Sequence, residues 1–288
     1  MLSMAKWEKD NLIKSNKMNL IIKAIKQKLN KTFNSPYRKV GIGLFTEKII
    51  KHSNNRNLKS IKILGHKTWY KNSHELLHSL DELFFSEIYK FKSKKEVVRI
   101  LDCGSNIGLS ILYFKSLFKN AIIKGFEPDN QNFELLNKNI QEWGFADIDI
   151  HKAAIWTTNG SINFSQTGSM GSQITQTESI DAKDQTKCIR LKELLNEPVD
   201  FLKMDIEGAE HEVLLDCGEQ LKMASNIFIE YHGKFSENHK LIEILQLLDG
   251  LDFQFYIKEA ADNFKTPFSR DNREIVFEVQ LNIFAFSK

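Results

Sequence analysis

From about residue 97 onward, short apolar runs alternate with segments of helical periodicity, and this alternation constrains the fold more than any other feature of the chain. The apolar runs are typical of buried strands, which we expect at residues 97–101, 122–126, 148–153, 201–204 and 227–230. The helical patterns cover residues 107–118, 131–143, 209–216 and 239–248. Alternation of this kind predicts a parallel sheet with helices on both faces. Two further strand candidates, residues 253–257 and 275–286, predict a terminal antiparallel hairpin.

The composition is that of a globular protein. Of 288 residues, 42% are hydrophobic and 27% are charged, with 4 Pro and 14 Gly, which excludes a collagen-like, mucin-like or wholly disordered chain. No apolar run approaches the roughly 18–20 residues that cross a bilayer. Cys103, Cys188 and Cys217 form no CxxC pair and fit reduced thiols. Residues 1–10 are rich in charge with no apolar segment behind them, so we expect no cleaved secretion signal and a cytoplasmic protein.

Charge is distributed unevenly along the chain. Residues 1–98 hold 21 Lys and Arg against 8 Asp and Glu, whereas the rest hold 19 against 29. We therefore predict a basic N-terminal extension at residues 1–95 and a second domain at residues 96–288. The extension has the patterns of a basic amphipathic helix at 1–33, a strand with its turn at 61–70 and a short helix at 80–91. Such an extension can pack on the acidic second domain of the same chain, lie on an anionic membrane, or bind nucleic acid.

The first strand of the alternating region ends in a glycine-containing loop. Asp102 ends the strand, Gly104 permits close approach of the backbone, and Gly108 lets the next helix pack near the strand. The helix N-terminus that follows favours anionic groups of a ligand. Asn106 stands where a dinucleotide fingerprint requires glycine, and no Gly-Lys-Ser/Thr of a P-loop follows. By itself, the loop is as compatible with an ordinary βα turn as with a binding site.

The second strand also ends in an acid. Glu127 is followed by Pro128, which stops the strand. Two syn hydroxyls of a ribose match the two oxygens of a carboxylate, so Glu127 is suited to hold an adenosine ligand, or else it serves the following helix as an N-terminal charge. Small residues around Ala154 leave room for a flat ring, and the glycine- and hydroxyl-rich residues 157–177 are typical of a mobile loop or an irregular hairpin.

Titratable residues gather at the ends of the fourth and fifth strands. Asp205 and Glu207 follow the fourth strand, and Glu230 and His232 end the fifth. Because neighbouring parallel strands end at one edge of a sheet, we expect these four side chains to converge and the carboxylates to raise one another's pKa. Helix capping is the better explanation for Glu210.

Several of these segments, in order, resemble the FkbM-type S-adenosylmethionine-dependent methyltransferases over residues 97–286. The similar segments are LDCGSNIGLS at 101–110, GFEPD at 125–129, LKMDIEGAE at 202–210, EYH at 230–232 and EVQLNIF at 278–284. LKMDIEGAE is the most specific of them. Ser105 stands where the family usually has alanine, and Cys103 where it often has Val or Ile.

The resemblance implies an α/β, Rossmann-like class I methyltransferase fold, with a mostly parallel seven-stranded sheet and a C-terminal antiparallel hairpin behind the basic, helical extension. It also implies that S-adenosylmethionine lies over the loop from Asp102 to Gly108, with its ribose held by Glu127. The cofactor-binding residues are then Asp102, Gly104, Ser105, Asn106, Gly108, Glu127, Pro128, Ala154 and Asp205.

Methyl transfer to a hydroxyl of a sugar, glycan or related natural product is the implied reaction. A hydroxyl is a poor nucleophile until its proton leaves, so the site needs a base. His232 is our first choice because its side chain titrates nearest neutrality, and Asp205 is the second. Glu207 and Glu230 complete the candidate catalytic set by orienting the acceptor.

Three alternatives fit parts of the sequence. We assign no metal ligand, but carboxylates around one mouth can also hold Mg²⁺, which lowers the pKa of an acceptor hydroxyl. The basic extension, with Trp7, Phe33 and Tyr37, suggests a nucleic-acid-binding protein, although only two of its basic residues are Arg. Glu127 permits an NAD-linked oxidoreductase, which Asn106 disfavours.

Overall fold

The computed structural model describes residues 23, 35–53, 57–163, 185–269 and 275–287. The chain divides into two compact units, Met1–Phe85 and Ser86–Lys288. The sequence pattern had placed this boundary between residues 95 and 96. Residues 86–95 fall in the second unit because aromatic side chains pack there, with the Tyr89 ring centroid 4.6 Å from that of Phe228 and the Phe91 centroid 5.0 Å from that of Phe201.

The first unit contains a β-hairpin and short helices. Its elements are a 3-10 helix at Pro36–Val40, α2 at Leu44–His52, β1 at Lys59–Ile63, β2 at His66–Tyr70, α3 at Ser73–Leu80 and a π-helical turn at Asp81–Phe85. β1 and β2 pair antiparallel across a turn in which Leu64 and Gly65 both have positive φ. The segment predicted as one strand with its turn is therefore a two-stranded hairpin. The basic helix predicted over residues 1–33 lies, apart from residue 23, outside the described residues.

The helix predicted over residues 80–91 is confirmed only in its first half, because helical structure ends with the π-helical turn at Asp81–Phe85. The α-helix lies earlier, at Ser73–Leu80, because Asn72 caps it. The Asn72 side chain accepts hydrogen bonds from the backbone N–H groups of His74 and Glu75, at 2.9 and 3.3 Å, which fixes the start of the helix.

The second unit contains the longer run of elements. Its strands are β3 Arg99–Cys103, β4 Ile122–Phe126, β5 Ile148–His151, β6 Ala154–Trp156, β7 Gly160–Asn163, β8 Gln185–Arg190, β9 Phe201–Met204, β10 Asn226–Gly233, β11 Phe253–Glu259 and β12 Val279–Ser287. Its α-helices are α4 Leu109–Leu117, α5 Asn130–Trp143, α6 Leu191–Leu194, α7 Glu210–Cys217 and α8 Asn238–Gly250, with 3-10 helices at Gly218–Met223 and Phe235–Glu237.

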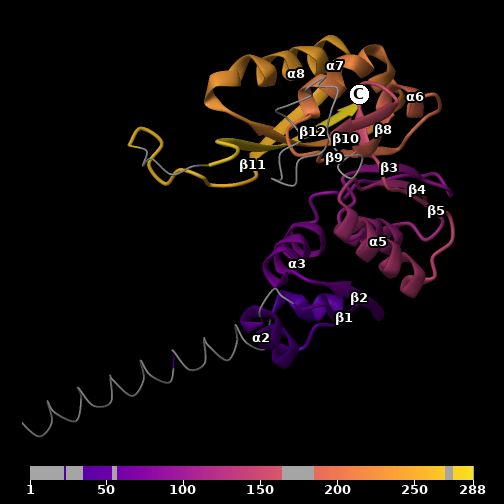
Figure 1. The fold of residues 1–288 in the computed structure, drawn as a ribbon, viewed down its shortest axis with the longest axis vertical. Helices are drawn as coiled ribbons and strands as arrows, with labels where there is room; N and C mark the ends of the chain where they lie inside the picture. The colour runs from indigo at the N-terminus through magenta and orange to yellow at the C-terminus, as the bar shows by residue number, and fades with distance from the viewer. Residues whose placement is uncertain (1–22, 24–34, 54–56, 164–184, 270–274, 288) are drawn as a thin grey trace, which may run out of the picture. The chain divides into compact units, whose positions relative to one another are not determined.

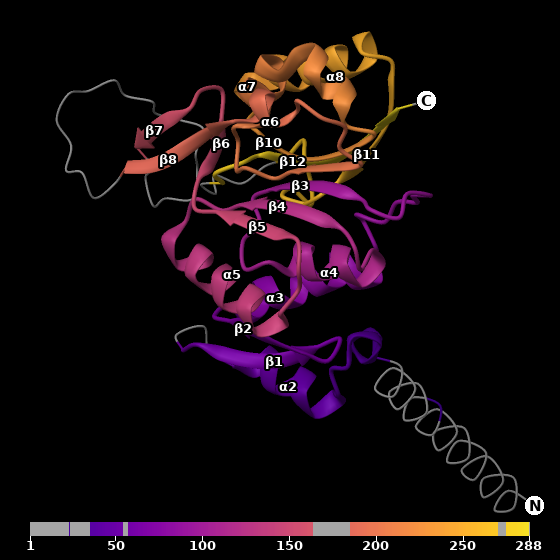
Figure 2. The ribbon, with the colours of Figure 1, turned by 90° about the vertical axis from the view of Figure 1, so that its right-hand side faces the viewer.

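A seven-stranded sheet forms the centre of this unit, in the order β11-β12-β10-β9-β3-β4-β5. The five strands from β10 to β5 are parallel, whereas β12 runs antiparallel to both of its neighbours, β10 and β11 (Figure 1). Helices α7 and α8 cover one face of the sheet, and α4 and α5 cover the other (Figure 2). The α/β fold, with its mostly parallel sheet and terminal antiparallel hairpin, is thus confirmed.

A second, three-stranded sheet in the order β6-β8-β7 was not expected from the sequence. The strand predicted over residues 148–153 ends at His151, and Ala154 begins β6, which pairs with β8. β7 and β8 pair antiparallel, and residues 164–184 between them lie outside the described residues. The described part of the segment predicted as a mobile loop or irregular hairpin therefore includes strand β7.

The three cysteines are free and buried. Burial raises the pKa of the Cys217 thiol to about 12, so its reactive thiolate form is disfavoured at neutral pH. Within the part of the chain that the structure describes, no helix is both long and apolar enough to cross a bilayer.

Candidate functional site

The candidate site lies along the edge of the sheet where the parallel strands end. Adjacent strands β10, β9, β3 and β4 bring together four parts of the chain along this edge. These are His232, the segment Asp205–Gly208, the loop at residues 102–108 (the glycine loop) and Glu127. Ligands of open α/β sheets bind at this edge because the loops there leave the sheet and diverge. The structure therefore places the predicted strand-end residues along one edge.

Backbone contacts anchor the glycine loop to both neighbouring strands. The N–H groups of Gly104 and Ser105 each donate to the carbonyl of Phe126, both at 2.9 Å. Gly104 has φ +91°, and a Cβ on it would lie 1.9 Å from the carbonyl oxygen of Asp205. Only glycine therefore fits where the first loop meets the loop after β9.

Gly108 also has positive φ, +93°, but its neighbours differ from those predicted. A Cβ at Gly108 would lie 2.8 Å from the Leu136 side chain and 3.3 Å from the Trp143 ring, both in α5. The glycine therefore allows α4 to begin against helix α5, whereas the sequence predicted close packing on a strand.

Glu127 is buried at the end of β4, next to the glycine loop. Its Oε2 accepts the backbone N–H of Asn106 at 2.8 Å, and its Oε1 accepts that of Asp129 at 2.9 Å. Burial raises the pKa of Glu127 to about 7, although these two hydrogen bonds oppose the shift. Each carboxylate oxygen keeps a second lone pair, so a ligand hydroxyl can still donate to it.

A buried cation, Lys203, connects the glycine loop with Asp205. Its Nζ donates to the Gly104 carbonyl and lies 3.1 Å from Asp205 Oδ2 and 3.7 Å from Asp102 Oδ1. Burial alone lowers the pKa of Lys203, but Asp205, Tyr89 and Asp102 raise it well above its ordinary value. The lysine is therefore charged and holds two segments of the site together.

Asp102, the second acid near Lys203, lies in the interior of the protein. It is fully buried, and its Oδ2 accepts the hydroxyl of Ser110 at 2.6 Å. Ser105, also buried, donates its hydroxyl to the Asp102 carbonyl at 3.0 Å. Lys203 was not among the predicted site residues, although a lysine in the middle of a buried apolar strand with acids nearby is a signal for an internal ion pair.

His232 is oriented by a buried carboxylate that the sequence analysis treated only as a helix cap. Glu210 is fully buried, and its Oε1 lies 3.2 Å from His232 Nδ1. The same carboxylate accepts the backbone N–H groups of Ile206 and Gly208 at 3.0–3.1 Å, so it also caps the turn before α7. Glu210 therefore fixes both the imidazole and the segment that carries Glu207.

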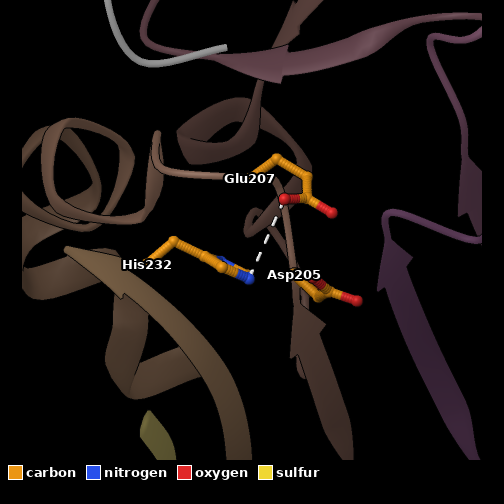
Figure 3. Close-up of side chains that lie close together, drawn as sticks. All are labelled: Asp205, Glu207 and His232. Atoms are coloured by element: carbon orange, nitrogen blue, oxygen red, sulfur yellow. Dashed lines mark ion pairs between the residues drawn. The ribbon is translucent and has the colours of Figure 1, made fainter. Parts of the chain in front are cut away.

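The opposite edge of the imidazole faces two further carboxylates. Nε2 of His232 lies 3.9 Å from Glu207 Oε2 and 3.7 Å from Glu230 Oε1. Figure 3 shows Asp205, Glu207 and His232 gathered at the mouth, with a dashed line joining His232 to Glu207. Glu207 has φ +58°, an uncommon backbone conformation for a non-glycine residue, which is often found at functional sites.

These neighbours change how His232 titrates. Burial by itself lowers the pKa of His232, but Glu210, Asp205 and Glu207 together raise it to about 10. These carboxylates therefore favour the protonated imidazole, in contrast to the near-neutral titration expected of an isolated histidine. The predicted mutual effect of the carboxylates is present at Glu207, whose pKa is raised by desolvation, Asp205 and Glu210 against the opposing charge of His232.

The donor atoms do not suit Mg²⁺. One ligand atom each from Asp205, Glu207 and His232 lie within 4.8 Å of one another. Mg²⁺ prefers oxygen ligands, whereas one of these three donors is an imidazole nitrogen.

Pro128 and Ala154 are two further residues of the predicted cofactor site. Pro128 comes directly after Glu127, two residues beyond the end of β4, and is half-buried. Ala154 is fully buried at the start of β6, where it pairs with Cys188 of β8. Ala154 thus belongs to the packed interior.

Known proteins share both the sequence motifs and the fold. The Methyltransferase FkbM domain matches residues 102–255. "Methyltransferase 1" of Beauveria bassiana (strain ARSEF 2860) is 26% identical over 198 residues, which cover 59% of this chain and 79% of that protein. The crystal structure of methyltransferase FkbM from Methylobacillus flagellatus KT superposes with a TM-score of 0.50 at 16% identity, covering 73% of this chain and 48% of that one.

This chain thus spans about half the length of the solved FkbM protein, and at that identity the likeness concerns the fold. The domain match covers more than half of the chain and includes the glycine loop, Glu127 and the segment around Lys203 and Glu210. The chain belongs to the FkbM methyltransferase family.

Proposed function

We propose that the protein transfers a methyl group from S-adenosylmethionine to a hydroxyl of a sugar, glycan or related natural product. The observation that carries the proposal is the placement, along one sheet edge, of a glycine loop with Glu127 beside a separate group of acids around His232. The first part suits a nucleoside cofactor, and the second suits a polyhydroxyl acceptor. Family membership and the methyltransferase relative favour methyl transfer over hydride transfer.

The residues beside the glycine loop fit S-adenosylmethionine. Gly104 and Asn106 have positive φ and shape the turn of the loop, and Asn106 is exposed where a ligand can approach. Glu127 retains acceptor capacity on both oxygens for two ribose hydroxyls. Gly104, Asn106 and Glu127 would contact the cofactor, whereas Asp102, Ser105, Gly108 and Lys203 would hold the loop in shape from beneath.

The cofactor supplies an electrophilic methyl group on a positively charged sulfonium. The protein must then align an acceptor oxygen with that methyl group and remove its proton. Asp205, Glu207, Glu230 and His232 lie where they can form hydrogen bonds with an acceptor hydroxyl. Several carboxylates at one mouth favour an uncharged, hydroxyl-rich acceptor and repel phosphorylated ones.

Replacing Glu127 with glutamine tests the cofactor site. In the ligand-free protein the pKa of Glu127 rises from 4.5 to about 7, so the folded state binds this proton more tightly than the unfolded state, and stability falls as pH rises between those values. Ribose hydroxyls donating to the carboxylate favour its charged form. We therefore expect wild-type affinity for S-adenosylhomocysteine, measured by calorimetry, to increase about tenfold from pH 6 to pH 8.

The Glu127→Gln variant should bind at least about tenfold more weakly at pH 8, with an affinity that no longer depends on pH, and its free energy of unfolding should lose the decline between pH 5 and pH 7. Glu134→Gln, which neutralises an exposed carboxylate on α5, is the control and should change neither. Unaltered binding by the Glu127→Gln protein would remove this residue from the cofactor site, and a folded wild type that binds no S-adenosylhomocysteine would overturn the proposed function.

The cellular setting is a further part of the proposal. A cytoplasmic enzyme that visits an anionic membrane surface through its basic extension would meet glycans or lipid-linked sugars during their assembly. The Lys-rich composition of residues 1–33 supports this idea. Flotation with vesicles containing anionic lipid tests it, because a protein lacking residues 1–33 should float less than the full chain, and equal flotation would refute it.

A further inference from the structure

We infer that Glu210 is a positioning residue that keeps His232 as an imidazolium, so that His232 donates a hydrogen bond to the acceptor hydroxyl and Glu207 receives its proton. The inference rests on the proposed function and assigns separate roles within the same site. It replaces His232 by Glu207 as the base.

Glu210 sets the tautomer and charge of His232. Glu210 is fully buried, and with Oε1 3.2 Å from His232 Nδ1 it binds the Nδ1–H of the ring. His232 is itself only 7% exposed, so a neutral ring would leave the Glu210 charge poorly compensated. The proton on Nδ1 is therefore retained, and a second proton on Nε2 points toward the mouth.

Four carboxylates of the described residues lie around the imidazole. Glu210 approaches from α7, Asp205 and Glu207 from the segment after β9, and Glu230 from β10 itself. The uncharged ring of Phe277 also packs against the imidazole, with its centroid 4.9 Å from that of His232. These groups favour the positively charged form of the ring, so His232 is poorly suited to accept another proton.

Of Asp205 and Glu207, the second is the better acceptor for the proton of the acceptor hydroxyl. Asp205 is paired with Lys203 at 3.1 Å, so its carboxylate is already engaged by a cation. Glu207 is half-exposed at the mouth, and its crowded surroundings favour proton uptake. Its Oε2 lies 3.9 Å from His232 Nε2, beyond hydrogen-bond distance, so an acceptor oxygen lying between them can bond to both.

The reaction moves one proton to Glu207 and one methyl group to the acceptor oxygen. The acceptor O–H bond breaks and its proton passes to the Glu207 carboxylate, an oxygen lone pair forms the new O–C bond, and the electron pair of the broken C–S bond stays on sulfur. Glu207 becomes neutral as the positive charge of the sulfonium disappears. His232 Nε2–H stabilises the negative charge that develops on the acceptor oxygen while its proton leaves.

NMR titration of the full-length, ligand-free protein tests the inference without an acceptor. With ¹⁵N-labelled histidine, and with the His232 signals assigned from a His232→Asn variant, we expect both ring nitrogens of His232 to be protonated at pH 7.5. In Glu210→Gln, the His232 midpoint should fall by about one pH unit or more. Glu243→Gln breaks a different Glu–His pair, in which Glu243 lies 2.7 Å from His211, and should leave His232 unchanged.

The titration of the Glu207 carboxyl carbon, assigned from Glu207→Gln, completes the test. A midpoint above the ordinary glutamate value supports its role as the proton acceptor, and an ordinary or lowered midpoint overturns that role. A wild-type His232 that is neutral at pH 7.5 overturns the whole inference, even if Glu210→Gln does not fold. Calorimetry with S-adenosylhomocysteine on the same samples separates these outcomes from failure of the proposed function.

Discussion

Replacing Lys203 with methionine is expected to destabilise the protein by about 3–5 kcal/mol. Lys203 is almost completely buried and compensates two carboxylates, the fully buried Asp102 and the partly exposed Asp205. Methionine keeps most of the volume but leaves Asp102 as an uncompensated charge in the interior, and removal of one partner from a buried ion pair carries this cost. Urea unfolding of the two proteins measures the difference in free energy of unfolding.

The matched control is Lys222→Met. Lys222 forms an exposed ion pair with Glu219 at 2.8 Å, and its loss should cost less than about 1 kcal/mol. A second comparison uses Lys203→Met combined with Asp102→Asn, which removes both buried charges and should recover part of the lost stability. If Lys203→Met were no more destabilising than Lys222→Met, the buried network would have no energetic role.

The pH dependence of this contribution has a definite sign. The pKa of Lys203 in the folded protein is well above its value of 10.5 in the unfolded chain. A cation with a raised pKa contributes its full stability below the unfolded value and loses it as the pH rises toward the folded one. The difference between wild type and Lys203→Met should therefore be constant from pH 6 to pH 9 and shrink only in strongly alkaline solution.

Gly104→Ala is expected to destabilise the protein by about 2–4 kcal/mol and to weaken binding of S-adenosylhomocysteine by at least about tenfold. Positive φ alone costs an alanine about 1 kcal/mol. At Gly104 the new methyl group would also lie 1.9 Å from the backbone oxygen of Asp205, so the glycine loop or the β9 loop must move. That movement would displace Asn106 and the Gly104 carbonyl, which accepts a hydrogen bond from Lys203.

Gly144→Ala provides the comparison. Gly144 ends α5 with φ +63°, and a Cβ there would meet no atom within 4 Å, so this change should show the cost of backbone conformation alone. Thermal unfolding and calorimetry are the measurements for both variants. Equal effects of the two substitutions would mean that the contact between the loops does not constrain the site.

The order of the parallel strands and helices was predictable because it depends on local patterns. β4 and β9 have the predicted bounds, Ile122–Phe126 and Phe201–Met204, since each is a short apolar run that must be buried in a central strand. The strand-end placement of Asp205 and His232 followed from the same argument. The small sheet of β6, β7 and β8 was missed because its strands are short and its pairing joins segments far apart in the sequence.

What the sequence by itself determined is therefore the class of fold, the family and the loops that carry polar residues, because periodicity and motif spacing are properties of neighbouring residues. Only the tertiary structure decided what those residues do. Lys203 and Glu210 became central because folding buries them against Asp102, Asp205 and His232, and the charge of a buried group depends on the partners that surround it. The same contacts turned His232 from the expected base into a cation.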